Sequence, residues 1–493
     1  MSAAVASREL AQLVMPALVW RAPGGFDHET DRIAEYLAMG VGGFLLIGGD
    51  QEVVRTLTKR LQRESRHPLL IAADLERGAG QQFRNATGLP PLSAIAALDD
   101  LEALKRAARL TAREARTMGV NWNLAPVCDV DFESENPVLG NRSFGSDFMR
   151  VGKLAAAWVE ACQSEGVLAC AKHFPGHGRT VQDSHLTLPV VDAPLDVLKE
   201  QDIAPFRAAI TAGVASIMTA HVAYPALDPS GLPATLSREI LQWLLRQQLK
   251  FDNIVVADAL IMRGVLEGRD ETEAAVMAVQ AGCDVLLQPD DVLAVVEALE
   301  TARREGRLDP EVVRRAMRRR LKWAQWASPP NDWRRPSGAD TAWGALLADR
   351  CVRIEHGPLP ALAAVTEVVI VDDDVHVPGS HATRNGLLDA LRAGGIDARR
   401  ADAPGAVSHG PLVLAVFGDR LPSKGRAGLS ADIETRVHQV LEAAREAQRD
   451  VIVCAMGDPR LVQALALTMP TVHAWSGDAV MQQAAARAMI KKR

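Results

Sequence analysis

The chain has 493 residues, of which 48% are hydrophobic and 24% charged, and its formal net charge is −6. This composition excludes a disordered chain and gives no support to nucleic-acid binding, which normally requires a basic surface. The length exceeds that of one ordinary domain, so two domains are expected.

The amino-terminal segment 1–20 lacks the basic start, the long apolar core and the cleavage site of a signal peptide, so we expect none. No apolar run approaches the roughly 18 residues that a membrane span requires. The six cysteines are scattered along the chain, at Cys128, Cys162, Cys170, Cys283, Cys351 and Cys454. We therefore expect neither a disulfide framework nor a cysteine metal cluster, and a cytoplasmic location.

Short apolar runs alternate with amphipathic helical patterns over residues 1–326. The predicted strands are Leu13–Trp20, Val41–Gly48, Leu69–Asp74, Val120–Val127, Val167–His173, Ser216–His221, Ile254–Asp258 and Asp284–Gln288. Helical patterns separate most of them, for example at Leu101–Met118, Val151–Ser164 and Leu236–Leu249. Strands and helices alternating in this number predict a (β/α)8 barrel of the TIM type.

The segment 327–340 is rich in proline and polar residues and is a predicted linker. Beyond it, the predicted strands are Val365–Val371, Leu412–Phe417, Val451–Ala455 and Thr471–Trp475, and the clearest helical patterns are Ala431–Gln448 and Ala479–Lys491. This alternation predicts a smaller three-layer α/β/α domain over residues 341–493, with a mostly parallel sheet. No strand is followed by a glycine-rich phosphate loop, so no nucleotide cofactor is expected.

Polar side chains follow five of the predicted barrel strands. They are Asp74 and Glu76, Asp129 and Asp131, Lys172 and His173, His221, and Asp258. In barrels of this type the carboxyl ends of the strands carry the active site. The sequence therefore predicts an active site at this end.

The loop 172–185 (KHFPGHGRTVQDSH) holds the densest group of reactive side chains. Glycines and a proline give it an irregular backbone, while its lysine, histidines and aspartate suit a site that binds hydroxyls and moves a proton. His173 and His177 have the spacing of two zinc ligands on a helix, but Pro175 and Gly176 between them oppose a helix. No metal is therefore expected.

Asp183 lies two residues before His185. Its carboxylate can turn back and accept the ring N–H, which would fix the tautomer and raise the basicity of the other ring nitrogen. The pair would then act as a general acid/base near neutral pH. The alternative is an Asx turn at Asp183, with His185 capping a helix.

Asp258 ends an apolar run. A buried carboxylate without partners is costly, so we expect it at the strand end, where polar groups meet it and where it can act as a nucleophile or an electrostatic stabiliser. The alternative is a helix cap or a salt-bridge partner. The presence of the loop 172–185 favours the nucleophile.

Lys172 and His173 are predicted donors to sugar hydroxyls, and with Asp74 and Arg142 they would form a charged, hydrogen-bonding site for a polyol. For Arg142 the alternative is a surface ion pair. His221 either joins this group or is a core histidine with its hydrogen bonds satisfied.

The segments 172–178 (KHFPGHG) and 183–185 (DSH) together resemble the signature of the β-N-acetylglucosaminidases among the family-three glycoside hydrolases. Other segments resemble that family too: 73–78 (ADLERG), 123–130 (NLAPVCDV), 140–144 (GNRSF) and 257–260 (ADAL). The resemblance spans the first predicted domain, whereas the second is similar only in general type.

This resemblance implies retaining removal of a terminal, non-reducing β-linked N-acetylglucosamine, which bacterial relatives often take from muropeptides in peptidoglycan recycling. Asp258 would form the glycosyl-enzyme, and His185, oriented by Asp183, would be the general acid/base. The residues implied to hold the sugar are Asp74, Arg142, Lys172 and His173.

The chain departs from the family pattern after residue 78, where both expected arginines are missing and Gln82 replaces one that lies near the sugar in relatives. The preferred sugar is therefore open, and a β-glucosidase on the same barrel is one alternative. A second is a phosphorylase, because a neutral imidazole does not repel an anionic acceptor such as phosphate. A third is a non-catalytic glycan-binding protein.

Overall fold

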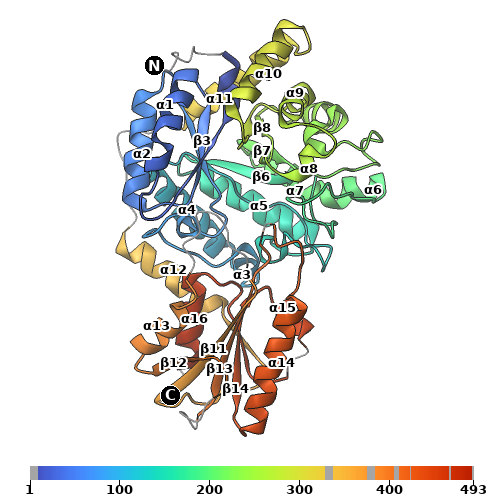
Figure 1. The fold of residues 1–493 in the computed structure, drawn as a ribbon. Helices are drawn as coiled ribbons and strands as arrows, with labels where there is room; N and C mark the ends of the chain where they lie inside the picture. The colour runs from blue at the N-terminus through green and yellow to red at the C-terminus, as the bar shows by residue number, and fades with distance from the viewer. Residues whose placement is uncertain are drawn as a thin grey trace.

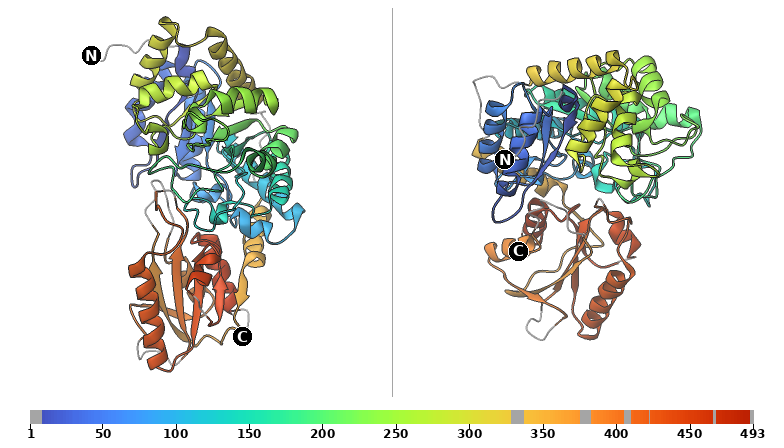
Figure 2. Two further views of the ribbon diagram at one scale, coloured as in Figure 1. Left: turned by 90° about the vertical axis from the view of Figure 1, so that its right-hand side faces the viewer. Right: turned by 45° about the horizontal axis from the view of Figure 1, so that its top comes forward.

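The computed structural model describes residues 9–327, 337–374, 383–404, 410–421, 423–465 and 468–490. Figure 1 shows a large unit, formed by the first two thirds of the chain, above a smaller unit formed by the rest. Figure 2 shows the same two units from other directions, with the carboxyl-terminal unit in contact with one side of the larger one.

The strands of the larger unit are β1 (Val14–Met15), β2 (Ala17–Val19), β3 (Gly43–Ile47), β4 (Leu70–Ala73), β5 (Trp122–Asn123), β6 (Leu168–Phe174), β7 (Ser216–Thr219), β8 (Ile254–Val256) and β9 (Leu286–Leu287). Strands β2 to β8 form a parallel sheet in chain order. A bridge from Val256 to Val285 and the pairing of β1 with β9 continue the ring. The predicted barrel is confirmed.

The helices around the barrel are α1 (Thr30–Met39), α2 (Gln51–Glu64), α3 (Leu92–Ala96), α4 (Leu101–Thr117), α5 (Phe148–Gln163), α6 (Leu195–Val197), α7 (Ala204–Thr211), α8 (Arg263–Leu266), α9 (Glu271–Ala281), α10 (Val292–Arg304) and α11 (Pro310–Trp326). Shorter or irregular helical segments are η1 (Glu9–Leu13), η2 (Asp27–Glu29), η3 (Ala79–Gln81), η4 (Gly140–Arg142), η5 (Leu198–Asp202), η6 (Ala234–Leu236) and η7 (Glu239–Gln248). Helix α4 illustrates how they form: Asp100 accepts the backbone N–H of Ala103 at 3.0 Å at its start, and its small apolar residues are buried.

The smaller unit contains the strands β10 (Arg353–Glu355), β11 (Val365–Asp372), β12 (Asp397–Ala401), β13 (Leu412–Gly418), β14 (Val451–Gly457) and β15 (Thr471–His473). Its helices are α12 (Gly338–Cys351), α13 (Gly386–Ala393), α14 (Ala431–Glu446), α15 (Arg460–Ala464) and α16 (Ala479–Ile490). The sheet order is β10-β15-β14-β13-β11-β12, and the pairing of β10 is antiparallel while the others are parallel.

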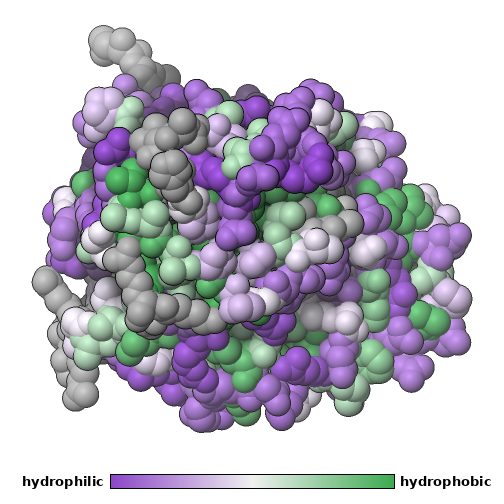
Figure 3. All heavy atoms as spheres, turned by 90° about the horizontal axis from the view of Figure 1, so that it is seen from below, coloured by the Kyte–Doolittle hydropathy of each residue, from purple (hydrophilic) through white to green (hydrophobic). Residues whose placement is uncertain are grey.

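Helices cover both faces of this second sheet. Helices α12, α13 and α16 share one apolar core with it, and α14 packs on the other face (Figure 1). The predicted three-layer α/β/α architecture is confirmed. Seen from this end of the molecule, the surface interleaves hydrophobic and hydrophilic residues (Figure 3).

The predicted linker 327–340 lies partly outside the described residues, which omit 328–336. Helix α12 begins within the predicted linker, because Ser337 and Asp340 cap its first turn reciprocally. The domain limits at residues 326 and 341 stay predictions. No helix in the described ranges combines the length and the apolar character needed to cross a bilayer.

Candidate active site

The predicted site residues gather at the carboxyl ends of the barrel strands. Asp74 follows β4, Lys172 and His173 lie at the end of β6, and Asp258 follows β8. These strands belong to one parallel sheet that curls on itself, so their carboxyl ends open to the same side.

Lys172 lies at the centre of a charged cluster that we define as Asp74, Glu76, Arg142 and Lys172. Its buried Nζ donates to Oδ1 of Asp74 at 2.6 Å and lies 2.8 Å from Oε1 of Glu76. Arg142 donates to both carboxylate oxygens of Glu76, at 2.7 and 3.0 Å. The alternative of a surface ion pair for Arg142 therefore does not hold.

The charges in this cluster hold one another in place. Burial by itself raises the pKa of Glu76, but Arg142 and Lys172 outweigh it and hold this pKa well below its usual range. Burial likewise opposes the charge on Lys172, and the carboxylates of Asp74 and Glu76 outweigh it and raise the Lys172 pKa. Glu76 was not among the predicted site residues. The signal for it was its place two residues beyond Asp74.

Asp129 is a second buried carboxylate that the sequence placed at a strand end without a role. It accepts the ring Nδ1–H of His173 at 2.7 Å and the backbone N–H of His177 at 2.7 Å. This pairing fixes the orientation of the His173 ring, whose Nε2 is left for other partners. Asp129 thus shapes the start of the loop 172–185.

His177 links the middle of this loop to its last residues. Its ring nitrogens bond the hydroxyls of Thr180 and Ser184, each at 3.0 Å. Asn136 donates to the backbone carbonyl of His177 at 2.8 Å. Burial lowers the pKa of His177 to about 4, so the ring is neutral at pH 7. His177 is therefore a support of the loop.

Asp183 and His185 form the predicted pair. Oδ1 of Asp183 accepts the ring Nδ1–H of His185 at 2.8 Å and its backbone N–H at 2.9 Å, so the Asx turn and the side-chain pair coexist. The Asp183 side chain is 1% exposed and that of His185 29% exposed. A buried carboxylate therefore orients a partly exposed imidazole through its Nδ1.

Asp258 accepts the backbone N–H of Ala259 at 2.8 Å. Burial raises its pKa, but the imidazoles of His173, His221 and His185 outweigh this effect and lower the pKa to about 2. The next helix, α8, begins only at Arg263, so Asp258 is not its cap. The carboxylate is ionised at neutral pH, as a nucleophile requires.

The acid/base loop touches the segment that carries Asp258. The backbone N–H of Gly264 donates to the carbonyl of Ser184 at 3.0 Å. The His185 imidazole is also close enough to contribute to the low pKa of Asp258. The fold thus brings the imidazole and the carboxylate to the same site.

His221 has no free ring nitrogen. It is fully buried, and its two nitrogens bond the hydroxyl of Thr235 at 2.7 Å and the carbonyl of Ala259 at 3.1 Å. Of the two readings of His221, the structure favours the core histidine, which supports the residue next to Asp258.

Gln82 is also engaged by the protein. Its Oε1 accepts the backbone N–H of Gly48 at 3.0 Å, so the amide group is held against the end of β3. Within the described ranges, no three His, Cys, Asp or Glu side chains are arranged to hold a metal ion.

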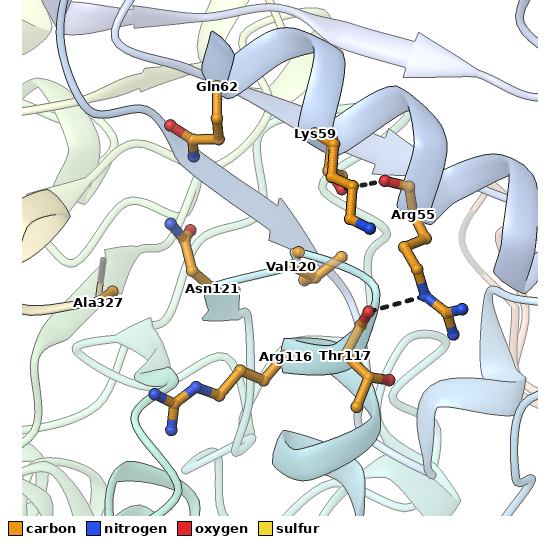
Figure 4. Close-up of a pocket in the computed structure, with 10 residues that line it drawn as sticks. Arg55, Lys59, Gln62, Arg116, Thr117, Val120, Asn121 and Ala327 are labelled. Carbon is orange, nitrogen blue, oxygen red and sulfur yellow. Dashed lines mark hydrogen bonds between the residues drawn. The ribbon is translucent and has the colours of Figure 1, made fainter. Parts of the chain in front are cut away.

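A cavity of about 430 Å³ lies elsewhere on the barrel, between α2, the end of α4 and the start of β5 (Figure 4). Arg55, Lys59, Gln62, Arg116 and Asn121 are among its lining residues. Helices α2 and α4, which carry most of these residues, lead into β4 and β5, and Asn121 directly precedes β5. The cavity therefore lies near the amino ends of the strands. It contains none of the predicted site residues.

Comparisons with known proteins agree with this geometry. Residues 6–322 match the family described as "Glycosyl hydrolase family 3 N terminal domain". The "Beta-hexosaminidase" of Thiobacillus denitrificans is 36% identical over 284 residues, which are 55% of this chain and 78% of that protein. The "Beta-N-acetylglucosaminidase/beta-glucosidase" of Cellulomonas fimi is 34% identical over 297 residues; the match spans 58% of this chain but about half, 53%, of that protein.

Several solved structures match nearly the whole chain. A family 3 β-N-acetylglucosaminidase from Paenibacillus has a TM-score of 0.84 and 27% identity, covering 98% of this chain and 96% of that one. A "Beta-glucoside phosphorylase" has the same TM-score of 0.84 at 23% identity, covering 99% and 91%, and shows the shared fold alone. The family match, which covers most of the chain and every predicted site residue, leads to one conclusion: the chain belongs to glycoside hydrolase family 3.

Proposed function

We propose that the protein is a retaining, exo-acting β-N-acetylglucosaminidase that removes terminal, non-reducing β-linked N-acetylglucosamine. The observation that carries the proposal is the pairing of an accessible imidazole, His185, with a buried carboxylate, Asp183, at the same barrel end as the ionised Asp258. The relatives named above as β-hexosaminidase and β-N-acetylglucosaminidase support the choice of sugar.

In the first step, Oδ of Asp258 attacks the anomeric carbon while the Nε2–H of the His185 imidazolium protonates the glycosidic oxygen, and the aglycone leaves as an alcohol. In the second step, neutral His185 takes a proton from water, and the hydroxide attacks the anomeric carbon and releases Asp258. Asp183 stabilises the imidazolium in each cycle and keeps its proton-carrying nitrogen directed at the sugar. Two displacements retain the β configuration.

The charged cluster supplies the sugar-binding side of the site. Asp74 is the most exposed of its carboxylates, with 37% of the side chain accessible, and is held by Lys172 behind it. A carboxylate fixed in this way can accept hydrogen bonds from sugar hydroxyls with little reorganisation. We propose that Asp74, Arg142, Lys172 and His173 hold the terminal sugar.

We also propose peptidoglycan fragments as the physiological substrates and the cytoplasm as the location. Support for the substrates is the resemblance of the loop 172–185 to enzymes that act on muropeptides. Support for the location is that all six cysteines are free, buried thiols, which is typical of a reducing compartment.

The test is a hydrolysis screen with chromogenic β-N-acetylglucosaminide and β-glucoside, each with and without inorganic phosphate. We expect turnover of the acetylated substrate, free sugar as the product and no phosphate dependence. Preferred turnover of the glucoside would identify a β-glucosidase, and sugar 1-phosphate would identify a phosphorylase. No turnover of either would favour a glycan-binding protein.

A further inference from the structure

The second domain reaches into the acid/base site of the barrel. The contact is made by a segment that follows β13 and that we call the docking segment, residues 419–421 and 423–426. The backbone N–H of Ser423 donates to Oδ2 of Asp183 at 2.9 Å. A Cβ placed on Gly425 would lie 2.9 Å from Cδ1 of Leu186, so Gly425 packs against the residue that follows His185 in the chain.

The docking segment is fixed within its own domain. The Nζ of Lys424, whose side chain is 0% exposed, donates to the carbonyl of Asp419 at 3.0 Å and lies 3.1 Å from Oδ2 of Asp373. Arg426 pairs with the same carboxylate of Asp373 at 2.8 Å. Asp373 follows β11, so the ends of two strands of the second sheet determine where the Ser423 N–H lies.

The barrel supplies hydrogen bonds to one of the two carboxylate oxygens of Asp183. Oδ1 accepts two N–H groups of His185, whereas Oδ2 accepts the backbone N–H of Ser423 from the second domain. A buried carboxylate oxygen that loses its donor is strongly destabilised, and the side chain would rotate to find another. Rotation of Asp183 would turn the imidazole of His185 with it.

We propose that the second domain positions the general acid/base, because the backbone N–H of Ser423 completes the hydrogen bonding of Asp183. Ser423 is thus a positioning residue, and protonation of the leaving group depends on docking of the two domains. The proposal rests on the proposed glycosidase function.

Other polar contacts also hold the second domain against the barrel. Asn141 donates to Oδ1 of Asp419 at 3.0 Å and to the carbonyl of Trp475 at 2.7 Å. Arg460 donates to Asp131 of the barrel at 2.7 Å. The pair Arg460–Asp131 does not touch Asp183 or His185, so it provides a matched control for the interface.

The experiment removes the N–H of residue 423 from the full-length enzyme and measures how hydrolysis depends on the leaving group. One variant replaces the amide before residue 423 with an ester, which deletes the donor but keeps the side chain. A second is Ser423→Pro, which also lacks the N–H but opposes the φ of +67° at this position. The controls are Ser423→Gly, which keeps the N–H and suits this φ, and Arg460→Gln.

Two β-N-acetylglucosaminides are compared, one with a 2,4-dinitrophenyl and one with a methyl leaving group. We expect the ester variant to lose about 10-fold or more in kcat/KM on the methyl glycoside and less than about 3-fold on the activated one, because only the poor leaving group needs protonation. In the control variants Ser423→Gly and Arg460→Gln, the ratio of kcat/KM between the two substrates should equal that of the wild type.

Equal losses on both substrates, or no loss in the ester variant, would overturn the proposal. Failure of the underlying function is distinguishable, because the unmodified enzyme would then hydrolyse neither glycoside. If Ser423→Pro does not fold, the ester variant still decides the outcome.

Discussion

The charged cluster shows how single residues are prepared for binding a sugar. Glu76 is almost fully buried, yet two cations, Arg142 and Lys172, hold it ionised. Lys172 in turn aligns Asp74, which is the more exposed partner. Side chains fixed by such ion pairs reorganise little when substrate binds. This preorganisation is typical of a catalytic site.

Asp258 is predicted to be indispensable. We expect Asp258→Ala to lower kcat/KM by about 10³-fold or more, because no other group can form the glycosyl-enzyme. The measurement is hydrolysis of an activated β-N-acetylglucosaminide, together with the intact mass of the wild type after reaction with a fluorosugar. Full activity of the variant would show that another residue is the nucleophile.

His185 is predicted to matter in proportion to the basicity of the leaving group. We expect His185→Ala to reduce kcat on poor leaving groups by about 10²- to 10⁴-fold and to change the first step on a dinitrophenyl glycoside little. Azide, which needs no general base, should accelerate turnover of the activated substrate by the variant. A uniform loss across leaving groups would contradict the acid/base role.

At the scale of elements, the loop 172–185 is a compact structure with internal supports. Gly178 approaches the barrel so closely that a Cβ there would lie 1.8 Å from the carbonyl oxygen of Val130. Arg179 pairs with the buried Asp202 at 2.9 Å and stacks on Phe132. These contacts explain why glycine and arginine occupy these positions between the histidines.

The neutral His177 predicts a pH dependence of stability. Its pKa is about 4 in the folded protein and about 6.5 in an unfolded chain, so only the unfolded state gains a proton as the pH falls from about 6.5 to about 4. The stabilisation contributed by a neutral His177 is present above this window and is lost through it, by up to about 3 kcal/mol. Above about pH 6.5 the contribution of His177 to the free energy of unfolding does not change with pH.

Urea unfolding of wild type and His177→Gln at several pH values tests this. We expect the variant to be less stable at about pH 7.5 because the bonds to Thr180 and Ser184 are weakened. The difference between the two proteins should shrink toward about pH 4.5. A difference that is constant with pH would show that His177 does not stay neutral.

At the scale of the whole molecule, the two domains are joined by buried polar contacts. The side chain of Arg420 is 4% exposed, and its guanidinium donates to the barrel carbonyls of Ser134 and Asn136. It also lies 3.6 Å from Asp458 of its own domain. Loss of such a donor leaves several buried acceptors unpaired.

Arg420→Met is therefore expected to weaken docking by about 2–4 kcal/mol. Differential scanning calorimetry should then show the second domain unfolding at a lower temperature than the barrel, as a separate transition. Arg445→Met, which removes a surface pair with Glu442, is the control and should leave the profile unchanged. An unaltered profile for Arg420→Met would contradict this account of the interface.

Edge strands mark the limit of the sequence prediction for the fold. The sequence predicts β11, β13, β14 and β15 because they are apolar runs, and the structure buries most of their residues. It does not predict β10 and β12, because they lie at the two edges of the sheet and carry charged, exposed residues. Their pairing depends on a neighbouring strand, which a local pattern does not contain.

By itself, the sequence determined the barrel, the second α/β domain, and the Asp183–His185 pair, whose members are two residues apart and meet through local geometry. Only the tertiary structure decided the partners of Glu76 and Asp129, the burial of His221, and the bond between Ser423 and Asp183. Those two residues are 240 positions apart. Hydrophobic periodicity and loop composition are properties of neighbouring residues, whereas a donor from another domain is placed by the packing of the whole chain.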